Sequence, residues 1–120
     1  MAGGASLLVF AIYSANLQDD IAFVTDGQLS GLCNKGITIA EVAPESAVGG
    51  PLCLVENGDR VTIDIEKHLL NLEVPEQELV DRRASMGEPE LKVAPGYLGI
   101  YQRDVQPMST GAVLIKSKIC

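Results

Sequence analysis

The sequence predicts a single α+β domain that is mostly β, folded as a barrel or sandwich with two or three helices packed outside. Short apolar runs rich in β-branched residues are separated by clusters of Gly, Pro, Asn and Asp, which is typical of hairpin-rich sheets. Strands and helices do not alternate regularly along the chain, and this argues against a doubly wound parallel sheet. With 120 residues the chain is long enough for one domain with one hydrophobic core.

Composition and charge exclude several classes of function. Lys and Arg number 9 and Asp and Glu number 16, so the net charge of −7 disfavours binding to nucleic-acid phosphates or to an anionic membrane. The apolar run at residues 7–12 is far shorter than the roughly 20 residues that a membrane helix needs. The three cysteines, Cys33, Cys53 and Cys120, are widely spaced and form no CxxC motif. They predict reduced thiols and a cytoplasmic protein rather than a disulfide framework or a metal site.

The first third of the chain predicts two strands and a loop. Residues 7–12 mix β-branched, aromatic, Ala and Leu side chains, so they fit either a helix or a strand, and we expect them in the core. Residues 21–25 predict a buried strand that ends in a turn at Asp26-Gly27. A glycine-punctuated loop over 26–36 leads to an alternating strand at 37–42.

The middle of the chain predicts a hairpin. Residues 44–48 read as one helical turn, because Pro suits the first helical position. A strand is expected at 52–55, followed by the Asn57-Gly58 pair, which is a strong hairpin signal. The returning strand at 60–65 alternates cleanly. Its inward side chains are predicted to be Val61, Ile63 and Ile65.

The last third predicts one more strand and two helices. After a strand at 69–74, Pro75 opens a helix with acidic residues in its first turn and Arg82-Arg83 in its last, as the helix dipole favours. Both arginines are expected to be solvated. Residues 86–95 predict an irregular connection, and residues 97–108 an amphipathic helix that Pro107 ends or kinks.

Four motifs carry a resemblance to a known family. The stretches are V-T-D-G-Q-L-S-G at 24–31, V-A-P-E-S-A at 42–47, L-V-E-N-G-D at 54–59 with I-D-I at 63–65, and E-L-V-D-R-R-A at 78–84. They resemble T-D-G-R-x-S-G, V-x-P-E-A, L-V-x-D-G-D-x-I-x-I-D and E-L-x-x-R-R-A of the dihydroxy-acid dehydratase and 6-phosphogluconate dehydratase family. The resemblance covers about residues 14–115.

This resemblance implies a more specific fold. Residues 1–120 would form a single domain that corresponds to the C-terminal domain of the dehydratase family. That domain is a swivelling β-barrel (β/β/α) with flanking helices, similar to the mobile domain of aconitase-type enzymes. The larger N-terminal domain, which holds the metals, lies outside this chain and would be its partner.

The resemblance also implies an activity. Family enzymes are hydro-lyases, known from branched-chain amino acid biosynthesis, that convert a 2,3-dihydroxy acid or a sugar acid to a 2-keto acid. By motif position Ser30 is the catalytic serine that takes the C2 proton, on a substrate loop with Asp26, Gly27 and Gly31. From the residues alone, Ser30 and Asp26 also fit ordinary turn formation.

No metal or cofactor ligand is expected in this chain. The family holds an iron–sulfur cluster and Mg²⁺ mainly through the N-terminal domain, and residues 3–10 contain no acidic residue where one family ligand belongs. Gln28 stands where the family usually has Arg, and Leu32 where a small or hydroxyl-bearing residue is common. We therefore expect the chain to be inactive alone, within an enzyme that can form a homo-oligomer. The alternative is a non-catalytic barrel used as a binding or assembly module.

Overall fold

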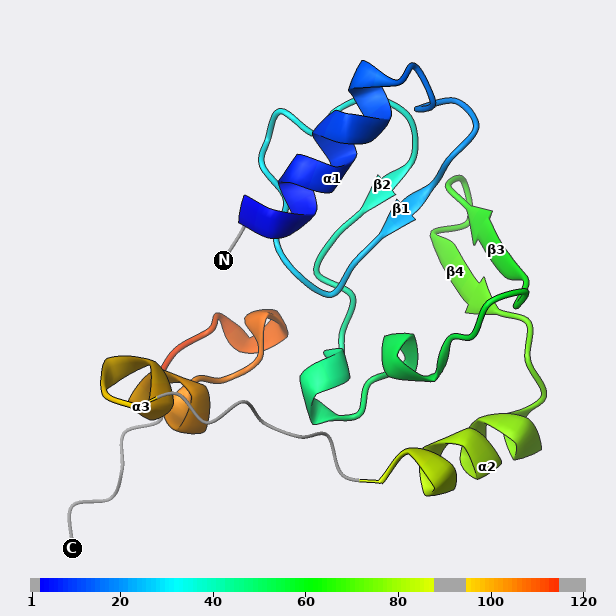
Figure 1. The fold of residues 1–120 in the computed structure, drawn as a ribbon. Helices are drawn as coiled ribbons and strands as arrows, with labels where there is room; N and C mark the ends of the chain where they lie inside the picture. The colour runs from blue at the N-terminus through cyan, green and yellow to red at the C-terminus, as the bar shows by residue number, and fades with distance from the viewer. Residues whose placement is uncertain (1–2, 88–94, 115–120) are drawn as a thin grey trace, which may run out of the picture.

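The computed structural model describes residues 3–87 and 95–114 (Figure 1). In this part of the chain three α-helices and two small sheets are linked by loops and short 3₁₀ turns. The helices are α1 (Gly3–Ser14), α2 (Glu76–Met86) and α3 (Tyr97–Asp104). The strands are β1 (Phe23–Val24), β2 (Thr38–Ile39), β3 (Val61–Asp64) and β4 (Leu69–Leu72).

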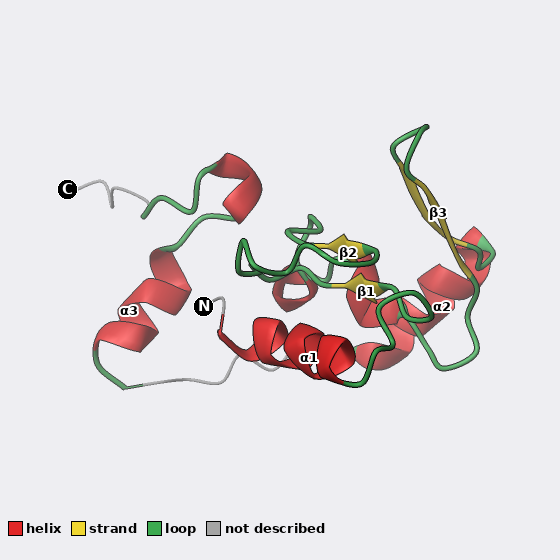
Figure 2. Ribbon diagram, turned by 90° about the horizontal axis from the view of Figure 1, so that it is seen from above, coloured by secondary structure: helices red, strands yellow, loops and turns green. Residues whose placement is uncertain are grey.

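The apolar run at 7–12 is helical. It lies within α1, which has no charged residue and packs along the β1–β2 pair (Figure 2). The hydroxyl of Tyr13 fixes the end of this helix to the loop between β1 and β2: it donates to the Lys35 carbonyl at 3.0 Å and accepts from the Lys35 N–H at 2.9 Å. Val9 is fully buried as expected, but Leu7 and Leu8 are exposed.

The predicted strands at 21–25 and 37–42 are confirmed as the shorter β1 and β2. They pair in parallel, with Phe23 opposite Thr38 and Val24 opposite Ile39. Because the strands are parallel, the loop leaves the C-terminal end of β1 and crosses to the opposite end of the pair, where β2 begins. It carries the D-G-Q-L-S-G stretch. This loop is therefore held at both ends by one sheet.

The strands at 60–65 and 69–74 are confirmed as β3 and β4, which pair antiparallel. The turn of their hairpin lies at 65–68, where His68 adopts a positive φ of 52°. The Asp64 carboxylate supports this turn, because it accepts from the Lys67 N–H at 2.9 Å and pairs with Lys67 Nζ at 2.8 Å.

The predicted strand at 52–55 is wrong. Residues Pro51–Leu54 form a 3₁₀ turn, which begins with Pro at its first position and is closed by a bond from the Cys53 N–H to the Gly50 carbonyl at 3.2 Å. Proline presets φ for such a turn and cannot donate to a strand ladder. The Asn57-Gly58 turn consequently joins no pair of strands. A second 3₁₀ turn, Ser46–Val48, agrees with the helical turn predicted at 44–48.

The helices predicted after Pro75 and at 97–108 are confirmed as α2 and α3, and α3 ends at Asp104, ahead of Pro107. The irregular connection predicted at 86–95 lies mostly outside the described residues. Within the described residues no helix has the length and apolar character needed to cross a membrane.

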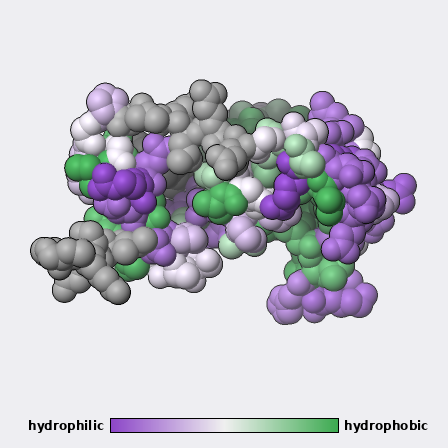
Figure 3. Space-filling model, turned by 90° about the horizontal axis from the view of Figure 1, so that it is seen from below, coloured by the Kyte–Doolittle hydropathy of each residue, from purple (hydrophilic) through white to green (hydrophobic). Residues whose placement is uncertain are grey.

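The mixture of helices and sheets is confirmed, but helical residues outnumber strand residues over 3–87 and 95–114, and no closed barrel forms there. Each of the two sheets has only two strands. The β3–β4 hairpin projects from the body, apolar along its length and polar at its tip (Figure 3). Val61 and Ile65, predicted to point inward, are therefore 42% and 68% exposed. Val9 and Leu54 are the buried apolar side chains of the described chain.

Candidate functional site

The loop after β1 contains all four residues that were predicted to form the site, and α1 positions this loop. The Ser30 N–H donates to Ser6 Oγ of α1 at 2.9 Å. Ser6 is buried, so the contact places this part of the loop against the helix. The two residues lie 24 positions apart, and no local signal in the sequence points to their contact.

Ser30 lies in a turn and stays half-buried. Its Oγ accepts from the Leu32 N–H at 3.3 Å, and its carbonyl accepts from the Cys33 N–H at 2.9 Å. The turn-forming role is therefore present in the structure. Because Ser30 is not sealed inside, its hydroxyl can still meet a ligand from outside. None of its three hydrogen-bond partners here carries a charge.

Asp26 ties the loop to the turn that follows β2. Its Oδ2 accepts from the Ser46 N–H at 2.7 Å. This hydrogen bond to the carboxylate is the main reason that the pKa of Asp26 lies below its ordinary value, since burial acts in the opposite direction. The contact joins the first two family-like motifs, 24–31 and 42–47. A backbone bond from Val42 N–H to the Thr25 carbonyl at 3.2 Å joins them as well.

The two loop glycines are not demanded by the fold of the described residues. The Gly27 N–H donates to Thr25 Oγ1 at 3.0 Å, and a Cβ at Gly27 would meet that oxygen at an ordinary 3.5 Å. A Cβ at Gly31 would meet nothing within 4 Å, and neither glycine has a positive φ. The space beside Gly31 is therefore open to a molecule from outside.

Two further side chains shape the surroundings of the loop. Gln28 Nε2 donates to Glu41 Oε1 at 3.4 Å, a long hydrogen bond between exposed groups. Leu32, two residues after Ser30, is 70% exposed. Exposing an apolar side chain to this extent is unfavourable in water, so covering Leu32 with another apolar surface would lower the free energy.

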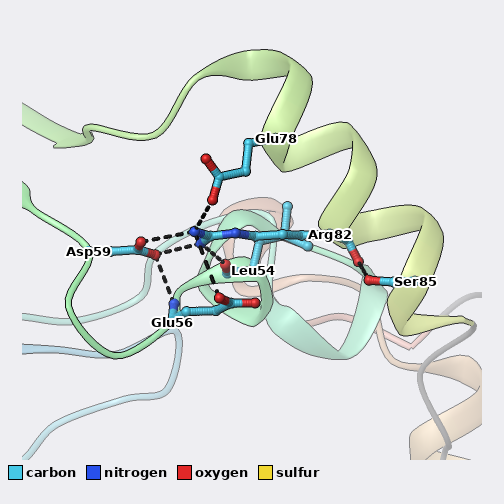
Figure 4. Close-up of polar contacts among 6 residues, drawn as sticks. All are labelled: Leu54, Glu56, Asp59, Glu78, Arg82 and Ser85. Carbon is cyan, nitrogen blue, oxygen red and sulfur yellow. Dashed lines mark hydrogen bonds and ion pairs between the residues drawn. The ribbon is translucent and has the colours of Figure 1, made fainter.

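The other two motifs, 54–59 and 78–84, are joined by Arg82. Its guanidinium donates to both carboxylate oxygens of Asp59 at 2.6 and 3.0 Å and to the Leu54 carbonyl at 2.9 Å (Figure 4). Glu78 pairs with it along α2, and Glu56 Oε2 lies 3.8 Å away. The Glu56 N–H donates to Asp59 Oδ2 at 2.8 Å, so the carboxylate also closes its own turn.

The prediction that Arg82 is a solvated charge is wrong. The side chains of Arg82 and Asp59 are only 13% and 10% exposed. Hydrogen bonds to Asp59 and then Glu78 raise the pKa of Arg82, and the same guanidinium lowers the pKa of Asp59. Glu78 and Arg82 are four residues apart on a helix, and this spacing is a signal in the sequence from which the pair can be predicted.

The described residues do not fit a metal ion or a cluster. Over 3–87 and 95–114 no group of three or more His, Cys, Asp or Glu side chains converges on one point. Cys33 and Cys53 are free thiols.

Comparison with known proteins gives a consistent family. A protein-family model described as Dihydroxy-acid/6-phosphogluconate dehydratase C-terminal matches residues 4–112. The dihydroxy-acid dehydratase of Ruminiclostridium cellulolyticum is 45% identical over 104 residues, which are 87% of this chain and 19% of the relative. That of Pyrobaculum neutrophilum is 46% identical over 103 residues, 86% of this chain and 18% of the relative. The chain thus spans less than a fifth of the length of these curated relatives.

Proposed function

Because this chain belongs to the dihydroxy-acid/6-phosphogluconate dehydratase family, as a C-terminal domain, we propose that it is the serine-bearing part of a hydro-lyase. The whole enzyme removes water from a 2,3-dihydroxy acid, or from a sugar acid, and yields a 2-keto acid. The observation that carries this proposal is the position of Ser30, half-buried on the loop after β1 and next to the open space at Gly31.

Ser30 Oγ takes the proton from C2 of the substrate. The electron pair of the C2–H bond forms a C2–C3 double bond, and the C3 hydroxyl leaves as hydroxide, which takes the proton back from Ser30 Oγ to become water. The resulting enol then transfers its hydroxyl proton to C3 and becomes the 2-keto acid. A serine hydroxyl is a weak base near neutral pH unless positive charge stabilises its anion. The neutral partners of Ser30 do not supply that charge, so it comes from the larger part of the enzyme.

The other loop residues position Ser30 and its ligand. Asp26 holds the loop through the Ser46 N–H, and Gly27 and Gly31 let the substrate approach the backbone. As a swivelling domain the chain closes over the substrate and excludes water. The iron–sulfur cluster and Mg²⁺ that the family resemblance implies do not fit the described residues of this chain and belong to its partner, the N-terminal dehydratase domain. The widely spaced cysteines favour a cytoplasmic enzyme.

Complementation tests this function. Residues 1–120 are co-expressed with the Ruminiclostridium cellulolyticum dehydratase shortened by the region that matches this chain, and 2-keto acid formation is measured under anaerobic conditions. We expect activity from the pair and none from either part alone. Ser30→Ala should lower kcat by roughly 100-fold or more, because positioned proton transfer contributes about that much.

Two variants serve as controls. Ser109→Ala removes an exposed hydroxyl from the 3₁₀ turn at Met108–Thr110 and should leave kcat unchanged. Ser30→Thr keeps a hydroxyl at the loop and should retain more activity than Ser30→Ala. Equal kcat for Ser30→Ala and the unsubstituted pair would refute the proposed role.

The second candidate is a non-catalytic binding or assembly module. Two observations favour it. Residues 3–10 carry no carboxylate. Gln28 stands where the family usually has Arg, and its uncharged amide makes only a long hydrogen bond to Glu41. The same experiment separates the candidates, because a module of this kind would bind the shortened dehydratase without restoring turnover.

A further inference from the structure

The two small sheets leave an apolar groove between them. We call this the inter-sheet groove; it encloses about 550 Å³ and is lined by side chains from both sheets and from the segment between them. They include Val24, Val42, Leu52, Val55, Val61 and Leu70. Nine of its ten lining residues are apolar, Asn71 being the exception. A second hollow of about 390 Å³ separates β2 from the same hairpin, and Leu70 lines both.

Every strand beside the groove has a free edge. Each sheet contains two strands, so within the described residues each strand pairs on one side only. Phe23 and Thr25 donate toward β2 from one edge of β1. Two-stranded ribbons are marginal in water, and an unpaired edge is a template for a further strand.

The chemistry of the groove selects an extended apolar segment as its occupant. A small apolar ligand could fill the volume, but it would leave the backbone groups of the strand edges without partners. A helix satisfies its own backbone and cannot pair with an edge. An extended segment does both, because its backbone bonds to the edge while alternate side chains enter the groove.

The source of that segment is indicated by the length of the relatives. More than four-fifths of each dihydroxy-acid dehydratase lies outside the region that this chain matches. Resting on the function proposed above, we propose that the inter-sheet groove receives an extended apolar segment from that larger part. The segment pairs with a free strand edge and joins the two sheets into one.

Hydrogen exchange on the complex tests this directly. The chain is mixed with the shortened Ruminiclostridium cellulolyticum dehydratase, and amide exchange is followed with and without it. We expect slower exchange, by at least tenfold, at amides of 23–25, 61–64 and 69–72. Exchange at α3, which lines neither hollow, should change little. A complex without protection at the strands would overturn the proposal, and so would the absence of a complex.

Substitutions give a second readout. Val61→Lys and Leu70→Lys place a charge in the groove, and each should weaken binding of the shortened dehydratase by at least tenfold. Val80→Lys is the matched control, since Val80 is exposed on α2 and does not line the groove. Equal affinity for all three variants contradicts the proposal. Thermal unfolding of each variant alone shows whether the substitution has destroyed the fold. The exchange experiment uses the unsubstituted chain, so it tests the proposal even if a variant fails to fold.

The outcomes separate this inference from the proposed function. A complex with protected strands and no turnover would refute the hydro-lyase role and keep the docking site. Turnover that survives Val61→Lys and Leu70→Lys would refute the docking site and keep the role. Protection of the same strands at high concentration of the chain alone, with formation of a dimer, would assign the groove to a second copy instead.

Discussion

Asp26 shows how one side chain can fix the loop that carries Ser30. It lies two residues after β1, accepts the Ser46 N–H at 2.7 Å and so holds the loop of Ser30 against the turn at 46–48. Hydrogen bonds to a charged acceptor contribute more than neutral ones. Asp26→Asn keeps an acceptor oxygen and removes the charge. We expect it to lower the free energy of unfolding by about 1 kcal/mol at pH 7, measured by urea titration.

The pH dependence of this loss follows from the lowered pKa of Asp26. The folded state binds the proton less readily than the unfolded state. The stabilisation is therefore complete above the ordinary aspartate pKa, and it is lost as the pH falls through the lowered folded value. The gap between Asp26→Asn and the unsubstituted chain should narrow as the pH falls below about 4. A gap that did not narrow between pH 4 and pH 2 would show that Asn perturbs the loop in another way.

The placement of the candidate residues could be predicted only as far as the local sequence reaches. A strand followed by Asp26-Gly27 places Ser30 on a loop, and the structure agrees. The residues that position this loop, Ser6 and Ser46, lie 24 and 20 positions from their partners. Such contacts arise from packing between elements, which periodicity and turn propensity do not report.

At the scale of the element, Arg82 links three pieces of backbone. It joins α2 to the carbonyl that ends the 3₁₀ turn Pro51–Leu54 and to the Asp59 turn. Arg82→Ala should therefore lower the urea midpoint clearly more than Arg83→Ala, because Arg83 is exposed at the next position of α2. Arg82→Lys should fall between them, since Lys cannot bond to both Asp59 oxygens in a planar fork. Equal midpoints for Arg82→Ala and Arg83→Ala would show that the cluster adds no stability.

The elements themselves were predicted well where the signal is local. The helix after Pro75 has acidic residues early and arginines late, and the strand at 60–65 alternates, so the local sequence predicts both. The structure of the region 51–59 differs from the strand and hairpin that its sequence predicts. Asn57-Gly58 is a strong hairpin signal, but Pro51 starts a 3₁₀ turn, and Asp59 is held by Arg82 from a distant helix. The turn is thus fixed by a tertiary contact, and the hairpin forms at 65–68 instead.

At the scale of the whole molecule, the chain is less compact than a typical domain of the same length. Its radius of gyration is 16.6 Å. A compact domain of this length would have about 14 Å. Fully or nearly buried apolar side chains are limited to Val9 and Leu54 in the described residues, while the projecting β3–β4 hairpin and the exposed Leu7 and Leu8 present apolar surface. These features agree with a domain that completes its core against a larger partner.

The distribution of metal ligands gives a test at the same scale. Iron–sulfur clusters are held by several thiolates that converge on one point. Cys33 lies in the loop between β1 and β2, Cys53 lies in the turn Pro51–Leu54, and no group of metal ligands converges over residues 3–87 and 95–114. Treated anaerobically with iron and sulfide, the chain alone should stay colourless and bind no stoichiometric iron. The shortened dehydratase should turn brown under the same conditions. Adding the chain should restore turnover, and the amount of bound iron should not rise.

Each departure from that result has a distinct meaning. Brown absorbance with stoichiometric iron in the chain alone would show that its own thiols form a cluster site, and would contradict the assignment of the metals to the partner. Turnover by the chain alone would contradict it more strongly, because Ser30 would then act as a base with only neutral hydrogen-bond partners. If iron content rises when the two parts are mixed, Cys33→Ser and Cys53→Ser decide whether this chain contributes a ligand. We expect both variants to match the unsubstituted chain in iron content and in turnover.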